Sequence, residues 1–198
     1  MNFVAKIDPN WENDDGLVMC TTIDGIHYPI TEPRPFNKTY KSHKLGSAAV
    51  DYEYAIYTHK DKVAWISPPY PAGFGDKNIF CSGLLGMIRA KQEARGNDFR
   101  VIADDGYNAG DLLDALCLRN ELDPREIAYF KDRALSRHET FNGMTKRYNC
   151  LCAKFRHDKG SNPNKEHPRH QACVEAICVT IQYELDLGVA KLLDPYPE

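Results

Sequence analysis

Three acidic residues occupy positions from which a folded chain could bring them to one point. Asp24 follows an apolar, β-branched run at residues 17–23, and Asp104 follows a second such run at residues 99–103. Both runs predict strands, and a strand end holds a carboxylate rigidly while leaving it open to solvent. Glu139 lies in a stretch that predicts a helix. Three carboxylates from three elements suit two Mg²⁺ or Mn²⁺ ions about 3.5–4 Å apart, an arrangement that cleaves phosphodiester bonds.

The place of Glu139 on its helix agrees with such a role. Within the predicted helix 124–155, apolar residues recur at alternating steps of three and four and define one buried face. At about 100° per residue, Glu139 points almost opposite that face, on the side that also carries Asn142 and Lys146. The residues of the apolar face are Phe141, Met144, Tyr148, Leu151 and Phe155.

Each carboxylate also has an ordinary structural explanation. An Asp after a strand commonly forms a turn or caps a helix, and a Glu on a polar helix face is commonly solvated. Asp76, at the start of a predicted helix, is most simply its N-cap. Type and spacing alone therefore leave both the metal site and these structural roles open.

The elements that must position the acidic residues follow from periodicity and turn signals. Strands are predicted at residues 17–23, 52–58, 63–67 and 99–103, with a helix beginning at Asp76 between the last two. Helices are predicted at 111–119, 124–155 and 171–187, the last ending at Gly188. A hairpin followed by a crossover helix and a further strand predicts an α/β fold, a mixed sheet flanked by helices.

Composition indicates a single globular domain. The chain has 198 residues, of which 42% are hydrophobic and 27% are charged. We expect a polar leader at 1–16, one domain at 17–188 and a tail at 189–198. No apolar run is long enough to span a membrane, the first residues lack the pattern of a signal peptide, and the seven cysteines are expected to be free thiols.

The formal net charge is −3, so bulk charge does not provide DNA affinity. Contact with DNA would depend on local basic patches or on a partner. The stretch after Asp24 and the loop 156–170 are both basic, and solvated loops are the alternative explanation for them. The candidates for contacts with DNA phosphates are Lys38, Lys41, His43, Lys44, Lys146 and Arg156.

The cysteines and histidines near the C-terminal end allow a second kind of metal site. Cys150 and Cys152, together with His167, His170 and Cys173, have the ligand types that zinc prefers. They do not form a paired C-x-x-C framework, and Cys150 and Cys152 would point in different directions from a helix. Buried or surface thiols are therefore the favoured interpretation.

Ordered motifs along the chain resemble the PIF/Harbinger transposases, nucleases of the DDE superfamily. T-I-D-G-I-H-Y-P-I at 22–30 is similar to their D-G-T-H-type motif, and A-D-D-G-Y at 103–107 is similar to their G-D-x-G-Y motif. S-R-H-E-T-F-N-G at 136–143 is similar to the helix that bears their last acidic residue. Residues 68–80 and 174–183 also fit, so that the resemblance extends over residues 17–188.

The resemblance implies an RNase H-like fold and metal-dependent cleavage and transfer of DNA strands. It implies that Asp24, Asp104 and Glu139 are the catalytic, metal-binding triad, with two Mg²⁺ or Mn²⁺ ions as cofactors. Asp76, Asp105 and His27 are auxiliary candidates. The implied partners are DNA and a separate Myb-like DNA-binding protein, with an oligomer allowed, and the expected location is the nucleus or cytoplasm.

Two departures from the family pattern leave an alternative open. Asp105 adjoins Asp104, so that either could bind the metal, although the motif favours Asp104. Few residues precede Asp24, whereas the family has a helix-turn-helix-like region upstream. The alternative is a catalytically silent, host-adopted or truncated relative that acts as a nuclear interaction module.

Overall fold

The centre of the molecule is one mixed sheet, seen here in a computed structural model that describes residues 17–95, 98–107, 110–156 and 167–194. The strands lie in the order β3-β2-β1-β5-β6, and a short strand β4 also pairs with β2. β2 is antiparallel to both β1 and β3, whereas β5 runs parallel to both β1 and β6. The strands are β1 (Leu17–Pro29), β2 (Ala49–Tyr57), β3 (Val63–Ile66), β4 (Tyr70–Pro71), β5 (Asp98–Ile102) and β6 (Leu116–Cys117).

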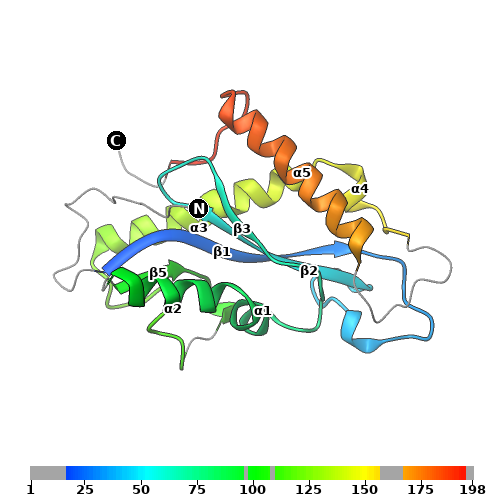
Figure 1. Ribbon diagram of the computed structural model, residues 1–198, viewed down its shortest axis with the longest axis horizontal. Helices are drawn as coiled ribbons and strands as arrows, with labels where there is room; N and C mark the ends of the chain where they lie inside the picture. Colours follow the sequence, from blue (N-terminus) through cyan, green and yellow to red (C-terminus); the bar gives the residue numbers. More distant parts are fainter. Residues whose placement is uncertain (1–16, 96–97, 108–109, 157–166, 195–198) are drawn as a thin grey trace.

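Helices cover both faces of this sheet (Figure 1). α1 and α2 lie on one face, and α3 and α5 lie on the other. This α/β architecture confirms the predicted fold class and is consistent with an RNase H-like core. The helices are α1 (Asp76–Ser82), α2 (Leu84–Arg95), α3 (Arg125–Thr145), α4 (Asn149–Cys152) and α5 (Pro168–Asp186), with short 3₁₀ helices η2 (Lys38–Tyr40) and η3 (Asp105–Tyr107). Among the described residues, no helix has the length and apolar character needed to cross a membrane.

The two central strands decide which side chains meet which helices. β1 and β2 pair without interruption from Thr21 opposite Tyr57 to Pro29 opposite Ala49. Since successive side chains alternate between faces, Asp24, Ile26 and Tyr28 point to one side and Ile23, Gly25 and His27 to the other. The first set belongs to the α3/α5 face, and the second to the α1/α2 face.

The core on the α3/α5 face is rich in tyrosines whose hydroxyls are all bonded. Tyr28 donates to Oγ1 of Thr145 at 2.8 Å, and its hydroxyl lies 3.0 Å from that of Tyr54. The Tyr52 hydroxyl lies 2.8 Å from Nδ1 of His170 on α5. Because a buried hydroxyl without a partner is costly, these bonds fix the positions of α3 and α5 on the sheet as well as stabilising them.

Several predicted boundaries were wrong. β1 does not end at Ile23 but continues through Asp24 and Gly25 to Pro29. The helix predicted at 111–119 is absent; its described residues form turns followed by strand β6. The helix predicted at 124–155 ends at Thr145, and after a turn the short α4 follows.

Other predictions at this level were closer. The apolar face at Phe141, Met144, Tyr148, Leu151 and Phe155 packs on one core even though the helix is interrupted. α5 covers the predicted last helix, and Gly188 follows it with a φ of +69°, a conformation that suits glycine. The predicted leader at 1–16 and residues 157–166 of the basic loop lie outside the described residues.

Candidate active site

Asp24 and Asp104 are adjacent because β1 and β5 are parallel neighbours. Thr22 pairs with Ile102, so two residues further along, Asp24 and Asp104 lie level with each other. Asp24 is inside β1, whereas Asp104 follows the end of β5, where the chain turns into η3. Oδ1 of Asp104 accepts a hydrogen bond of 3.0 Å from the backbone N–H of Gly106, which fixes that turn.

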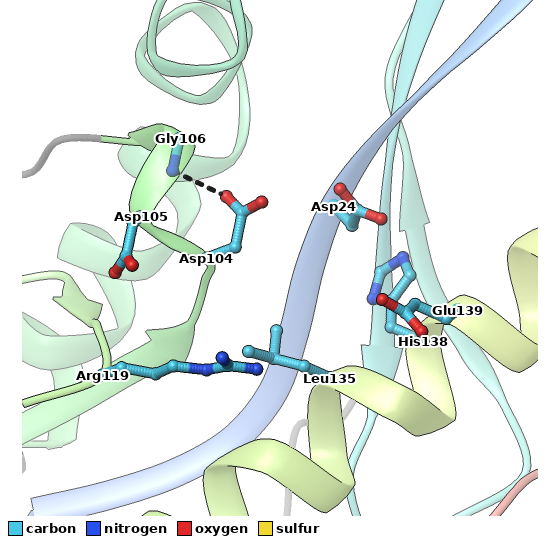
Figure 2. A pocket seen from close by; sticks show the side chains of 8 residues that line it. All are labelled: Asp24, Asp104, Asp105, Gly106, Arg119, Leu135, His138 and Glu139. Carbon is cyan, nitrogen blue, oxygen red and sulfur yellow. Dashed lines mark hydrogen bonds between the residues drawn. The ribbon is translucent and has the colours of Figure 1, made fainter. Parts of the chain in front are cut away.

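α3 supplies the third carboxylate to the same place. Asp24, Asp104 and Glu139 all line one pocket of about 300 Å³. Figure 2 shows Asp104 facing Asp24 from one side, with Glu139 and His138 on α3 at the other. The structure thus brings the three predicted triad residues together, and the other residues of the lining are Asp105, Gly106, Arg119, Leu135 and His138.

The Asp24 carboxyl lies in an environment that disfavours its charged form. Burial is the main cause that raises its pKa to about 6, and the neighbouring carboxylates Asp104 and Asp76 add to the effect. The Lys44 ammonium acts in the opposite direction. In addition, Nδ2 of Asn142 donates a hydrogen bond of 2.7 Å to Oδ2 of Asp24. A carboxylate that burial and like charges destabilise gains strongly from a nearby divalent cation.

His138 attaches the Glu139 helix to the first strand. Its Nδ1 lies 2.9 Å from Oγ1 of Thr22 on β1, and both side chains are fully buried. Burial lowers the pKa of His138 to about 3, so the imidazole is neutral at physiological pH. Thr22 is two residues before Asp24 on β1. The contact therefore holds the part of α3 that carries Glu139 close to Asp24.

A second pocket continues from the first. It has a volume of about 360 Å³ and shares Asp24 and Glu139 with the acidic pocket. β5 ends level with Thr22, so the next residues of β1 border this space along an edge that lacks a β5 partner. Two of the predicted DNA-contact residues, Lys44 and Lys146, line it. An acidic centre next to a basic margin suits a polyanion bound across metal ions.

The other predicted DNA-contact residues lie elsewhere. Lys38, Lys41, His43 and Arg156 are described but line neither of these two pockets. All four are exposed, and Lys38 begins η2. Their contact with DNA stays a prediction.

The auxiliary candidates divide between the two faces of the sheet. Asp105 lines the acidic pocket beside Asp104. His27 and Asp76 instead lie on the α1 face with Asp51, where one ligand atom from each lies within 4.8 Å of the others. The N-cap role expected for Asp76 is wrong, because α1 begins at Asp76, its N-cap is Gly75, and no side chain caps it.

The acidic region is larger than the sequence indicated. Asp51 and Glu53 of β2 are fully buried and pair across the sheet with His27 and Gly25, respectively. Oε2 of Glu53 accepts a hydrogen bond of 2.9 Å from the Tyr107 hydroxyl, and burial raises the pKa of Glu53 to about 8. Sequence reasoning missed both residues. The signal was available, since two acidic residues two apart in a strand that is otherwise apolar and aromatic share a face.

Arg119, Asn142 and His138 were also missed as site residues. Arg119 fell in a segment wrongly predicted as a helix; its Nε bonds Oδ1 of Asp132 at 2.9 Å, and it lines the acidic pocket. His138 directly precedes Glu139 on α3, and Asn142 follows it by three residues. Only the adjacency of α3 and β1 gives them their partners.

The zinc interpretation that the sequence left as the weaker one gains no support. His167 and His170 contact the hydroxyls of Tyr40 and Tyr52, respectively, and Cys150 and Cys152 are exposed on α4. The cysteines at 81, 117, 150, 152, 173 and 178 are free thiols.

Comparison with known proteins identifies the type of domain. A family model described as DDE superfamily endonuclease matches residues 23–181. This range includes all three predicted triad residues and most of the sheet. No curated protein and no solved structure gave a match.

Proposed function

The chain belongs to the DDE superfamily endonuclease family, and on this premise we propose that it is the catalytic core of a metal-dependent DNA nuclease of the transposase kind. Its reaction is the hydrolysis or transfer of DNA phosphodiester strands. The observation that carries the proposal is the meeting of Asp24, Asp104 and Glu139, from β1, β5 and α3, in one pocket.

The residues fit a pair of hard divalent cations. The three proposed ligands are carboxylates, which Mg²⁺ and Mn²⁺ prefer, and the pocket is open enough to admit a phosphate. When bound, such ions activate the attacking oxygen and stabilise the leaving one. Asp24 lies between Asp104 and Glu139, so these three carboxylates would hold the cations together. Asn142 orients the Asp24 carboxylate.

The remaining residues of the two pockets position the DNA strand and hold the site rigid. Lys44 and Lys146 are placed to contact the phosphates that flank the reacting one, along the free edge of β1. Arg119 supplies a positive group within the acidic pocket, where it is held by Asp132. Neutral His138 provides rigidity rather than charge, because burial lowers its pKa to about 3.

We further propose that the chain is of the PIF/Harbinger subtype and works with a separate DNA-binding protein. The motif at residues 22–30 supports the subtype. The net charge of −3 supports the partner, because the basic margin around the site is small and neutralises few phosphates.

Nicking of supercoiled plasmid in the presence of Mg²⁺ or Mn²⁺ tests the function. The wild type should nick, whereas Asp24→Asn, Asp104→Asn and Glu139→Gln should each abolish nicking without loss of fold. Glu126→Gln is the matched control, since Glu126 is an exposed residue in the first turn of the same helix. Asp105→Asn identifies which of the adjacent acids binds metal, and we expect it to retain activity.

Equal nicking by the wild type and Glu139→Gln would reject the catalytic assignment. If neither the wild type nor any variant nicks DNA, even with a basic DNA-binding partner added, the chain is instead a silent relative that retains the fold.

A further inference from the structure

His27, Asp51 and Asp76 form a compact group that the proposed strand-cleavage site does not use. They come from three elements, β1, β2 and α1, and one potential ligand atom from each lies within 4.8 Å of the other two. We propose that they form a second, separate cation site on the α1 face of the sheet. The site is suited to a divalent transition metal such as Mn²⁺ or Zn²⁺.

The buried carboxylate of Asp51 points to a missing ligand. Its side chain is fully buried, and neither oxygen has a hydrogen-bond partner among the described residues. Nε2 of His27 lies 3.3 Å from its Oδ2. A buried carboxylate is costly unless it is neutralised and fully coordinated, and an imidazole on one side leaves Oδ1 without a partner. A cation between Asp51 and Asp76 would supply that partner.

The backbone leaves room for the group at Gly25. A Cβ added there would lie 2.5 Å from Oδ1 of Asp76 and 3.4 Å from Oδ1 of Asp51. Both carboxylates thus approach the strand through the space that a side chain would fill. The Gly25 φ is not in the left-handed region, so the requirement for glycine here comes from these two carboxylates rather than from the backbone.

His27 is held as metal-binding histidines commonly are. Its Nδ1 lies 2.7 Å from Oγ of Ser42, which leaves Nε2 directed at Asp51. Such a contact on the far ring nitrogen fixes the ring and the nitrogen that binds. One imidazole with two carboxylates favours a transition metal over Mg²⁺ or Ca²⁺, which prefer oxygen donors only.

The site is distinct from the Asp24 pocket, although the two are close. The side chains of Asp24 and His27 leave β1 on opposite faces, although both residues line the second pocket. Asp76 connects them from the edge, since its Oδ2 lies 3.6 Å from where a Gly106 Cβ would be, next to Asp104. Because the residues differ, this inference does not depend on the proposed nuclease function.

Metal binding can therefore be tested with the cleavage site disabled. In the full chain carrying Asp24→Asn, Asp104→Asn and Glu139→Gln, titration with Mn²⁺ should still show one bound ion. Pulsed electron paramagnetic resonance of that ion should show coupling to an imidazole nitrogen. Excess Mg²⁺ should fail to displace it.

Adding His27→Gln should remove the nitrogen coupling, whereas His43→Gln, which alters an exposed histidine next to Ser42, should leave it unchanged. Asp51→Asn and Asp76→Asn should each weaken Mn²⁺ binding, and Ser42→Ala should weaken it roughly tenfold through the loss of an outer contact. If Asp51→Asn fails to fold, the Mn²⁺ affinity of Asp76→Asn provides the test, because Asp76 is partly exposed.

The proposal is overturned if the triad-disabled chain binds no Mn²⁺ and no Zn²⁺. Nitrogen coupling that persists in His27→Gln would equally reject it. Loss of DNA cleavage alone bears only on the nuclease proposal, so the two failures are distinguishable.

Discussion

The side-chain amide of Asn142 donates a hydrogen bond of 2.7 Å to Oδ2 of Asp24, joining the last turn of α3 to the centre of β1. Both groups are largely buried, and the bond favours the ionised carboxylate against the burial that raises its pKa to about 6. A hydrogen bond to a charged group contributes about 1.5–3 kcal/mol. We therefore expect Asn142→Ala to slow metal-dependent nicking about tenfold or more.

The same substitution should raise the pKa of Asp24 further in the metal-free protein, which carbon-detected NMR titration of the carboxyl would measure. Asn149→Ala, at an exposed position of α4, is the control. An unchanged Asp24 titration in Asn142→Ala would contradict the assigned role.

His138 gives the stability of the metal-free protein a specific dependence on pH. Burial lowers the folded pKa of His138 from 6.5 to about 3, so below pH 6.5 the unfolded chain takes up a proton that the folded chain refuses. Its contribution is intact above pH 6.5 and is lost as the pH falls toward 3, at about 1.4 kcal/mol per pH unit.

Between pH 7 and pH 5, the wild type should thus lose roughly 2 kcal/mol more unfolding free energy than His138→Gln. Urea unfolding in the presence of a chelator measures the difference. The raised pKa values of Asp24 and Glu53 change the unfolding free energy in the opposite direction over this pH range. They do so in both proteins, so comparing the two slopes of unfolding free energy against pH cancels their contributions. His43→Gln, an exposed histidine, should leave the wild-type slope unchanged; the same slope in His138→Gln would contradict the prediction.

Gly25 is a site where even a methyl group should be harmful. Alanine normally improves a strand position occupied by glycine, but here the added Cβ would lie 2.5 Å from Oδ1 of Asp76. We expect Gly25→Ala to cost about 1–3 kcal/mol of unfolding free energy through the forced displacement of Asp76 and the start of α1. Thermal unfolding measures the change.

The matched control is Gly86→Ala in α2, where an added Cβ meets nothing within 4 Å. Helix propensity predicts a gain of about 0.5–1 kcal/mol there. A Gly25→Ala protein as stable as the wild type would show that Asp76 moves freely, contrary to the contacts described above.

Lys44 and Lys146 should affect DNA binding through charge alone. Each exposed lysine that contacts a phosphate releases counterions, so removing one should lower the slope of log affinity against log salt by roughly one. Lys44→Ala and Lys146→Ala should each do so and weaken binding to unrelated DNA sequences equally. Fluorescence anisotropy with labelled duplexes over a range of NaCl concentrations provides the measurement, and Lys60→Ala, on the exposed β2–β3 turn, is the control. A slope that stays at the wild-type value in both variants would exclude these lysines as phosphate contacts.

The sequence was sufficient to predict the α/β class from local patterns. It predicted the meeting of the three carboxylates only through the resemblance to a family, because residue type and spacing alone left that site open. Prediction from the sequence failed where contacts with distant residues determine the local structure. The pair Asp24-Gly25 has the composition of a turn, yet β1 continues through it, because Gly25 makes room for Asp76 and Asp51 from other elements.

The other errors have the same origin. β6 is only two residues long, and its pairing with β5 cannot be inferred from so short a segment. The contacts of His138 with Thr22 and of His27 with Asp51 join residues far apart in sequence or on different strands. No periodicity within the segments that carry these residues indicates the contacts.

The alternation of β1 places both groups of ligands in the same stretch of backbone. Asp24 serves one face, and Gly25 and His27 serve the other. A slip of β1 by one residue against β2 would send each to the wrong face, so a single inserted or deleted residue here would disable both sites at once. The long uninterrupted pairing of β1 with β2 thus fixes the strand register, and the register decides on which face each ligand lies.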